Sequence, residues 1–364
     1  LALEVGKNRM EALGEVQETA DFFRHYAEDF ERHEGFDHAL PDDPLPGFKS
    51  RNRSVMRPYG AWVVIAPYNF PFALAGGPVA AALVTGNTVV FKSASDTPWS
   101  GRLLADCLRD AGLPAGVFNY LNGSGNEVGE VLVWHPRTAG VTFTGSFEVG
   151  MHIYRGMAAG IYPRPCIAEM GGKNACVVTA NADLERAATG IVRSAFGMSG
   201  QKCSALSRVY VDEGVADALS EKLLARIQAL RIGDPLETGT QLGPLVSQAQ
   251  FDKVLACIQS AREEGGRVLC GGETIDRPGW FIAPTVIGGL GPESATNREE
   301  IFGPVVTLQA FDSDDEAVAL ANASDYGLSA SLFTKDISRA HRLAAGLHVG
   351  MVWINTWLMR DLRT

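Results

Sequence analysis

Cys203 is the best candidate nucleophile among the six cysteines of this 364-residue chain. It lies in the polar stretch SGQKCSALSR, between an expected helix and an expected strand, whereas the other five cysteines have apolar neighbours typical of packing residues. A cysteine on a loop that a rigid fold positions is suited to covalent catalysis. The sequence shows no evident cysteine–histidine pairing, so a papain-like triad is only weakly supported.

Two more polar residues have types that assist a nucleophile. Glu169 ends an apolar strand beside two glycines, where a carboxylate can serve as a general base. Asn69 lies in APYNFPF, and its side-chain amide can donate to a developing oxyanion. A solvated acid and an asparagine in a turn are the plainer interpretations of the same residues.

Two glycine turns follow consecutive expected strands. The stretch GSGNEVG at 123–129 opens a short helix and misses the dinucleotide-binding spacing GxGxxG by one residue. Thr144-Gly145-Ser146 forms a second turn of this kind. Turns at the ends of consecutive parallel strands line one edge of a sheet, where such folds bind ligands. A phosphate cradle and ordinary glycine-rich turns both remain open at this point.

Strands and helices alternate along the chain, with short connections between them. A helix is expected over 1–34 and a loop over 41–49. Apolar strands are then expected at 61–66, 88–91, 117–121 and 140–143, with helices at 72–84, 100–111, 127–134 and 149–159. A second series has strands at 175–178, 208–211, 305–311, 329–333 and 351–354, with helices at 183–196, 215–230, 251–264, 315–323 and 337–345. This alternation predicts two α/β domains with parallel, doubly wound sheets.

Composition excludes several classes of protein. The formal charge of −10, with no basic cluster, argues against nucleic acid and anionic lipid as partners. No run of 18 apolar residues indicates a membrane span. The cysteines include no CxxC motif, so a metal site is not expected. Scattered cysteines in a chain of this length are typical of reduced thiols in a cytoplasmic protein.

Six motifs make nearly the whole chain resemble the aldehyde dehydrogenase superfamily. They are APYNFPF at 66–72, GNTVVFKSASDTP at 86–98, FTGS at 143–146, EMGGKN at 169–174, GQKCS at 200–204 and EEIFGPV at 299–305. The resemblance implies an α/β fold with a Rossmann-type cofactor domain and a second α/β catalytic domain. It assigns 1–40 and 59–169 to the dinucleotide-binding domain, 41–58 to an oligomerisation segment and 170–364 to the catalytic domain.

The family's roles carry over to matching positions. Cys203 matches the nucleophile, Glu169 the general base, and Asn69 the oxyanion donor beside the backbone N–H of Cys203. The implied cofactor is NAD or NADP. The implied cofactor-binding residues are Ala66, Pro67, Tyr68, Lys92, Ser95, Gly125, Gly145, Ser146, Gly171, Glu300 and Phe302. Among these, Lys92 matches a lysine that binds the adenosine ribose, and Glu300 the acid that holds the nicotinamide ribose.

Three departures from the family pattern bear on function. Ser95 stands where NAD-selective members often have glutamate, so NADP is expected to be tolerated. Pro78 stands nine residues after Asn69, where many members carry a lysine, so any proton relay through that lysine is absent. Family members also extend further at both ends, and the chain is therefore expected to be truncated.

The expected substrate is a small-molecule aldehyde that also carries a carboxylate. The opening LEVGKNRMEALGEVQE and the stretch GQKCSALSRVYV resemble the branch that oxidises L-glutamate γ-semialdehyde, in which Ser204 would bind the substrate's carboxylate. The end, VWINTWLMRDLRT, instead resembles muconic semialdehyde dehydrogenases, and Arg360 or Arg363 would then pair with a carboxylate. A non-catalytic cofactor-binding relative and a coenzyme A-acylating enzyme are the alternatives, and Glu169 favours hydrolysis over acylation. The family is usually homodimeric or homotetrameric.

Overall fold

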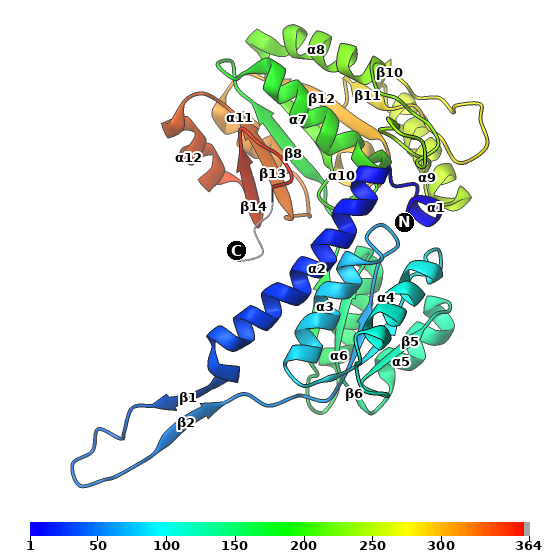
Figure 1. The fold of residues 1–364 in the computed structure, drawn as a ribbon. Helices are drawn as coiled ribbons and strands as arrows, with labels where there is room; N and C mark the ends of the chain where they lie inside the picture. Colours follow the sequence, from blue (N-terminus) through cyan, green and yellow to red (C-terminus); the bar gives the residue numbers. More distant parts are fainter. Residues whose placement is uncertain (360–364) are drawn as a thin grey trace. The chain divides into compact units, whose positions relative to one another are not determined.

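The computed structural model describes residues 1–359, which form two compact units (Figure 1). The first unit comprises residues 12–170, and the second comprises residues 1–11 together with residues 171–359. The expected domains put residues 1–40 with the first unit, so the structure differs for residues 1–11.

A left-handed glycine explains why the opening segment departs from one continuous helix. Helix α1 (Ala2–Val5) ends at Gly6, whose φ of 81° favours glycine, and α2 (Arg9–Arg32) begins three residues later. A Cβ on Gly6 would lie 2.4 Å from the carbonyl oxygen of Pro244, so this turn packs closely on the second unit. The side chain of Asn8 also donates to the carbonyl of Gln241 (2.9 Å).

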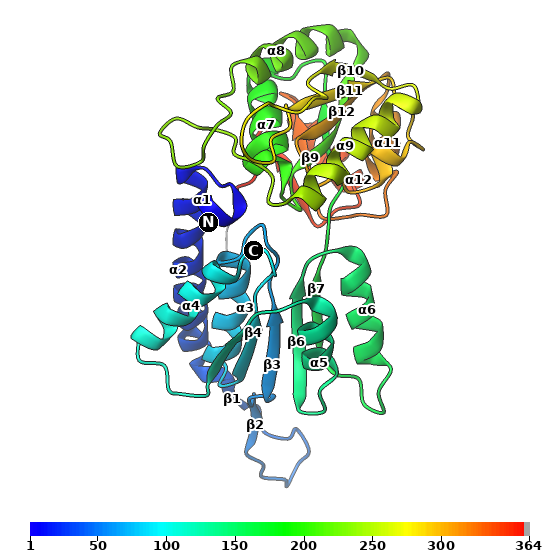
Figure 2. The same cartoon turned by 90° about the vertical axis from the view of Figure 1, so that its right-hand side faces the viewer.

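Five parallel strands form the sheet of the first unit, in the order β5-β4-β3-β6-β7. The strands are β3 (Ala61–Ile65), β4 (Thr88–Lys92), β5 (Phe118–Leu121), β6 (Thr138–Thr144) and β7 (Cys166–Glu169). The helical segments between them are α3 (Ala73–Val84), α4 (Pro98–Asp110), η2 (Gly125–Gly129), α5 (Glu130–Trp134) and α6 (Phe147–Ala158). Figure 2 shows this strand and helix alternation in the lower part of the view.

Helices cover both faces of that sheet, as the alternation predicts. Val64, Val89 and Phe91 pack with α3 and α4, whereas Val63 and Val141 pack with α5 and α6. Interior strands of a parallel sheet are buried on both faces, which explains their continuous apolar runs.

A short antiparallel hairpin precedes this sheet. Strand β1 (Asp37–Leu40) follows the turn η1 (Glu34–Phe36) and pairs with β2 (Asn52–Val55) around the expected loop. All four residues of β2 are exposed, so no apolar alternation marked it in the sequence. The expected oligomerisation role of residues 41–58 stays a prediction.

The second unit has a seven-stranded sheet in the order β10-β11-β12-β9-β8-β13-β14, parallel except for β10 against β11. Its strands are β8 (Asn174–Val178), β9 (Leu206–Asp212), β10 (Arg267–Cys270), β11 (Thr285–Gly288), β12 (Val305–Phe311), β13 (Ser329–Phe333) and β14 (Met351–Ile354). Its other helical segments are α7 (Leu184–Phe196), η3 (Gly197–Gly200), η4 (Glu213–Val215), α8 (Ala216–Gln228), α9 (Gln248–Glu263), α10 (Ala295–Arg298), α11 (Asp314–Asn322) and α12 (Ile337–Gly346).

Helices cover both faces of this second sheet as well. Cys176, Val178 and Val306 pack with α7 and α8, and Val177 and Tyr210 pack with α11 and α12. Helices α7, α9, α11 and α12 begin at side chains that cap the first turn: Asp183, Ser247, Ser313 and Asp336. The two α/β units predicted from the sequence are confirmed.

Within residues 1–359, no helix is long and apolar enough to cross a membrane. The same residues contain no group of three or more histidine, cysteine, aspartate or glutamate side chains arranged to hold a metal ion.

Candidate active site

Cys203 lies on the loop between the tight turn η3 and strand β9 of the second unit. Its side chain is half-buried, as is that of Ser204. The turn before it contains two non-glycine residues with positive φ, Met198 (54°) and Ser199 (53°). Such backbone is strained and persists only where surrounding contacts hold it, which is common next to functional residues.

Buried hydrogen bonds hold this turn. The hydroxyl of Ser199 donates to the carbonyl of Gly243 (2.6 Å). The side chain of Gln201, 1% exposed, donates to the carbonyl of Met198 (3.1 Å) and accepts from the N–H of Val246 (3.0 Å). The loop that carries Cys203 is therefore tied to residues more than forty positions later in the chain.

Glu300 approaches the same loop from the segment before β12. Its carboxylate accepts from the N–H of Gly172 (2.9 Å), and a Cβ on Gly171 would lie 2.4 Å from it. Burial raises the pKa of Glu300, and the Gly172 N–H and nearby lysines act against that rise. A small recess is lined by Gly172, Lys202, Glu300 and Phe302 among others. Phe302 has a φ of 59°.

Arg208 is a buried cation that sequence reasoning missed. Its guanidinium, on strand β9, donates to the carbonyl of Lys173 through Nε (3.1 Å) and Nη2 (2.7 Å), and to that of Ala321 (2.9 Å). Burial lowers its pKa, and Tyr210 acts in the opposite direction. The bonds to Lys173 hold the end of the segment 171–173, which precedes β8 and contacts Glu300. The sequence signal that could have identified Arg208 is its position as a charged residue inside the apolar run LSRVYV.

Asn69 lies in the first unit, on the loop between β3 and α3, and is 3% exposed. Glu15 holds the end of this loop, because its carboxylate accepts from the N–H groups of Phe72 (2.8 Å) and Ala73 (3.1 Å). The start is held by the N–H of Ala66, which donates to the carbonyl of Lys92 (3.3 Å).

Glu169 is the last residue of β7, the edge strand of the first unit. Its carbonyl accepts from the N–H of Gly145 (3.1 Å), which joins it to the turn after β6. The side chain is exposed and lines a cavity of about 340 Å³. Pro78 of α3 lines the same cavity, so the position where the family often carries a lysine faces the pocket of Glu169.

The candidate cofactor residues of the first unit follow the carboxyl ends of its strands. Lys92 ends β4, is buried, and donates to the carbonyl of Ser93 (3.0 Å), and burial lowers the pKa of its amine. Ser146 caps α6 by accepting from Val149 (3.4 Å). The exposed Ser95 hydroxyl donates to the carbonyl of Gly123 (3.3 Å).

Strand register aligns these positions along one edge. Lys92 is level with Ile65 of β3, and Ile65 is level with Phe143 of β6. The segments that leave this edge carry Ala66, Pro67, Tyr68, Asn69, Ser95, Gly125, Gly145 and Ser146. The parallel sheet thus brings together residues from four sequence motifs.

The predicted site residues therefore form two sets. Asn69, Glu169 and the residues around Lys92 belong to the first unit, and Cys203, Ser204, Gly171, Glu300 and Phe302 belong to the second. Arg360 and Arg363 lie outside the described residues.

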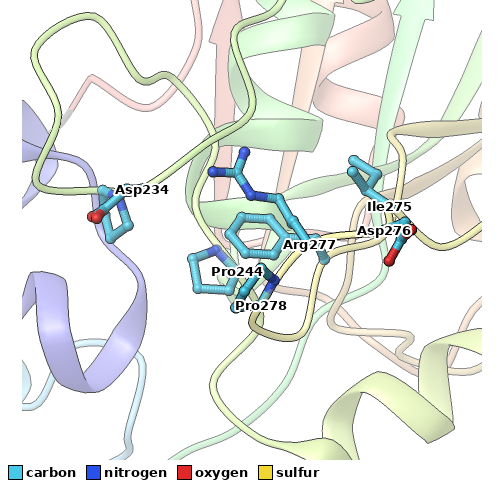
Figure 3. A pocket seen from close by; sticks show the side chains of 8 residues that line it. Asp234, Pro244, Ile275, Asp276, Arg277 and Pro278 are labelled. Atoms are coloured by element: carbon cyan, nitrogen blue, oxygen red, sulfur yellow. The ribbon is translucent and has the colours of Figure 1, made fainter.

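A further pocket of the second unit contains none of the predicted residues. It has a volume of about 600 Å³ and is lined by Asp234, Pro235, Pro244, Ile275, Asp276, Arg277, Pro278 and Phe281. Figure 3 shows the Arg277 side chain between Asp234 and Asp276. The guanidinium lies 4.7 Å from the centre of the Phe281 ring and donates to the carbonyl of Ile232 (2.9 Å). Arg277 therefore has partners both in its own loop, at Phe281, and in the segment that contains Ile232.

Comparisons with known proteins identify the family to which this chain belongs. The model of the aldehyde dehydrogenase family matches residues 1–364. Relatives named 1-pyrroline-5-carboxylate dehydrogenase, from Geobacillus thermodenitrificans and Bacillus cytotoxicus, are each 42% identical over 360 residues, which is 98% of this chain and 68% of theirs.

Solved structures are similar along the whole chain. The NAD-dependent aldehyde dehydrogenase of Sinorhizobium meliloti has a TM-score of 0.93 at 37% identity, covering 99% of this chain and 70% of that one. Betaine aldehyde dehydrogenase of Staphylococcus aureus, in complex with NAD+, has a TM-score of 0.93 at 32% identity, covering 100% and 71%. The chain belongs to the aldehyde dehydrogenase family, whose members are NAD(P)-dependent oxidoreductases.

Proposed function

We propose that this chain oxidises an aldehyde that also carries a carboxylate, such as L-glutamate γ-semialdehyde, to the corresponding carboxylic acid. The observation that carries the proposal is the 42% identity, over 98% of the chain, to relatives named 1-pyrroline-5-carboxylate dehydrogenase. The chain has a cysteine, a glutamate and an asparagine at the positions that match the family's catalytic residues.

Cys203 begins the reaction as a thiolate. Its sulfur forms a bond to the aldehyde carbon, and the carbonyl oxygen becomes an oxyanion that Asn69 and the backbone N–H of Cys203 stabilise. Loss of hydride from that carbon leaves a thioester on Cys203. Glu169 then takes a proton from water, the hydroxide attacks the thioester carbon, and the carbon–sulfur bond breaks to release the acid and the thiolate.

The first-unit residues fit a dinucleotide. Gly125 has open space where a Cβ would stand, and the turns at Gly125 and Ser146 follow β5 and β6 at the same edge of the sheet. Lys92 would hold the adenosine ribose and Glu300 the nicotinamide ribose, since ammonium and carboxylate groups both bond to hydroxyls. NAD(P)+ supplies the hydride acceptor when bound. Ser95 is neutral, which supports use of both NAD+ and NADP+.

Ser204, next to the nucleophile, would bind the substrate's carboxylate. Its hydroxyl is a donor suited to that group, and the side chain is half-buried on the Cys203 loop. The motif at the end of the chain supports a muconic semialdehyde as the second candidate substrate, through Arg360 or Arg363. Both candidates carry a carboxylate in addition to the aldehyde.

The hairpin supports the proposal that a homodimer or homotetramer forms through residues 41–58. Leu45, Phe48 and Met56 are exposed there, and exposed apolar side chains in one segment favour association. Light scattering of the chain and of a variant lacking residues 42–50 tests this. The same number of chains per assembly in both proteins would contradict the proposal.

The test of function is absorbance at the reduced-nicotinamide band. Glutamate γ-semialdehyde is supplied with NAD+ and then with NADP+, to the chain, to Cys203→Ala and to Cys107→Ala. Cys107 is exposed on α4 and is the matched control for loss of a thiol. We expect reduction by the chain and by C107A, and none by C203A.

Each other result has a definite meaning. Cofactor reduction with a muconic semialdehyde but not with glutamate γ-semialdehyde would make the muconic semialdehyde the proposed substrate. Reduction that persists in C203A would refute the cysteine mechanism. No reduction with either substrate, alongside measurable binding of NAD+, would favour a cofactor-binding protein without catalysis.

A further inference from the structure

Asn174, the first residue of β8, contacts the loop that carries Cys203. Its side-chain NH2 donates to the carbonyl oxygens of Cys203 (2.6 Å) and Ala205 (2.8 Å), 29 and 31 residues later in the chain. We propose that Asn174 is a positioning residue that sets the orientation of the peptide after Cys203, and with it the thiol. The inference rests on the proposed role of Cys203 as the nucleophile.

The amide of Asn174 uses its full hydrogen-bonding capacity. While both donor bonds go to the Cys203 loop, its Oδ1 accepts from the N–H (3.1 Å) and from the hydroxyl (2.9 Å) of Ser329. A side-chain amide has two donors and two acceptor sites, so all four functions are satisfied. The residue is 2% exposed, and each lost partner would leave a buried polar group without a bond.

The strands give this amide a rigid base. Ser329 begins β13, which pairs with β8 in parallel, and β8 pairs on its other side with β9. The register shifts between Asn174 and Ala175, at the level of Leu206. The pairing of β8 with β9 therefore ends at Leu206, next to the Cys203 loop. Beyond this last pair, the side chain of Asn174 bonds to the carbonyls of the loop.

Gly172 restricts the same carbonyl from another side. A Cβ at this position would lie 2.2 Å from the carbonyl oxygen of Cys203 and 3.0 Å from Nδ2 of Asn174. Only glycine allows so close an approach. The Cys203 carbonyl thus has a steric limit at Gly172 and a directed bond at Asn174, and both contacts restrict that peptide.

Residues 201–205 belong to no helix or strand, so regular backbone pairing does not hold the Cys203 peptide. Within the loop, the N–H of Ala205 donates to the carbonyl of Lys202 (3.0 Å), which closes a turn around Cys203. A side chain that bonds to the carbonyls of both Cys203 and Ala205 spans this turn. Misplacement of a reacting group by about 1 Å can reduce a rate roughly a hundredfold.

The test compares Asn174→Asp with Asn322→Asp. Aspartate has the shape of asparagine but no donors, so N174D loses both bonds to the loop. Asn322, at the end of α11, donates to the carbonyl of Gly346 (2.8 Å) and accepts from the N–H of His348 (2.9 Å), so N322D removes a comparable bond in another part of the same unit. N174A and N322A repeat the comparison without an added charge.

Three measurements on the full chain report on the loop. Hydrogen exchange of residues 199–205 is expected to accelerate about tenfold in both Asn174 variants, with β9 unchanged. The rate of Cys203 alkylation by iodoacetamide, relative to that of the exposed Cys107, is expected to change at least threefold, a readout that needs no cofactor. The kcat for glutamate γ-semialdehyde is expected to fall about tenfold or more, with the KM for NAD+ unchanged.

The Asn322 variants are expected to leave all three unchanged at the Cys203 loop. Exchange and relative alkylation that are the same in the Asn174 and Asn322 variants would overturn the proposal. Should the parent chain show no turnover, the proposed function would fail, whereas exchange and alkylation would still decide the role of Asn174.

Discussion

Replacement of Lys173 by methionine is expected to stabilise the second unit near neutral pH, and this gain is expected to shrink as the pH rises. The Lys173 side chain is 1% exposed, and its Nζ has no hydrogen-bond partner within the described part of the chain. Burial lowers the pKa of the amine from 10.5 to about 7, with Arg208 adding to the effect, while Cys257 and Glu300 oppose it.

The sign follows from the protons bound in each state. Because the pKa of Lys173 is lower in the folded state, the unfolded chain holds one more proton between about pH 7 and pH 10.5. Stability of the parent chain therefore rises with pH through this window. One pKa unit is equivalent to about 1.4 kcal/mol, so the parent should gain about 3 kcal/mol relative to K173M between about pH 7 and pH 9.5.

Urea unfolding of the parent and K173M, in reducing buffer at several pH values in this range, measures the difference. The other charged or titratable groups near the amine are present in both chains: Cys257, Glu299, Glu300 and Arg208. Lys335, exposed between β13 and α12, supplies the control variant K335M, in which a lysine is replaced by methionine at the surface of the same unit.

The change of the difference with pH is decisive, because a packing effect of methionine adds a constant at every pH. A constant difference between parent and K173M would mean that the buried amine keeps its ordinary pKa. That result would refute the reasoning from burial.

Three further changes have expected outcomes. Glu169→Gln should leave one rapid turnover per site, seen as a burst of reduced nicotinamide in stopped-flow absorbance. The steady rate after the burst should fall about a hundredfold or more, because hydrolysis of the thioester lacks its base. A uniform loss of rate without a burst would place Glu169 elsewhere in the mechanism. Ser204→Ala should raise the KM for glutamate γ-semialdehyde about tenfold, since a bond to a charged group is lost, and leave the KM for propanal unchanged; equal effects on both aldehydes would exclude a role in carboxylate binding. Ser95→Glu should weaken NADP+ about tenfold relative to NAD+ in steady-state kinetics, because a carboxylate repels the 2′-phosphate; an unchanged ratio would show that this position does not contact the ribose.

The alternation of strands and helices could be predicted because most of its elements have a local signal. The apolar run AWVVIA predicted β3, and the Ala-rich stretch after Asn69 predicted α3, close to their observed bounds. Such runs are buried on both faces of a parallel sheet, so their composition alone identifies them.

Elements without that signal were missed. Strand β2 is exposed at every residue, and β10, an edge strand of four residues, is only partly buried. The break at Gly6 was missed as well, because a single glycine in a helical pattern is ambiguous until its φ and its contact with Pro244 are known.

Residue type and motif were enough to identify Cys203, Glu169 and Asn69 as candidate catalytic groups, because their chemistry belongs to the side chains themselves. Their surroundings were decided by tertiary structure. Asn174 reaches Cys203 across 29 residues and Ser329 across 155, and Arg208 reaches Ala321 across 113. No local pattern encodes such bonds, since they form only when parallel strands distant in sequence become neighbours. The sequence by itself thus determined which groups are available for chemistry, and the packing of β8, β9 and β13 determined how the Cys203 loop is held.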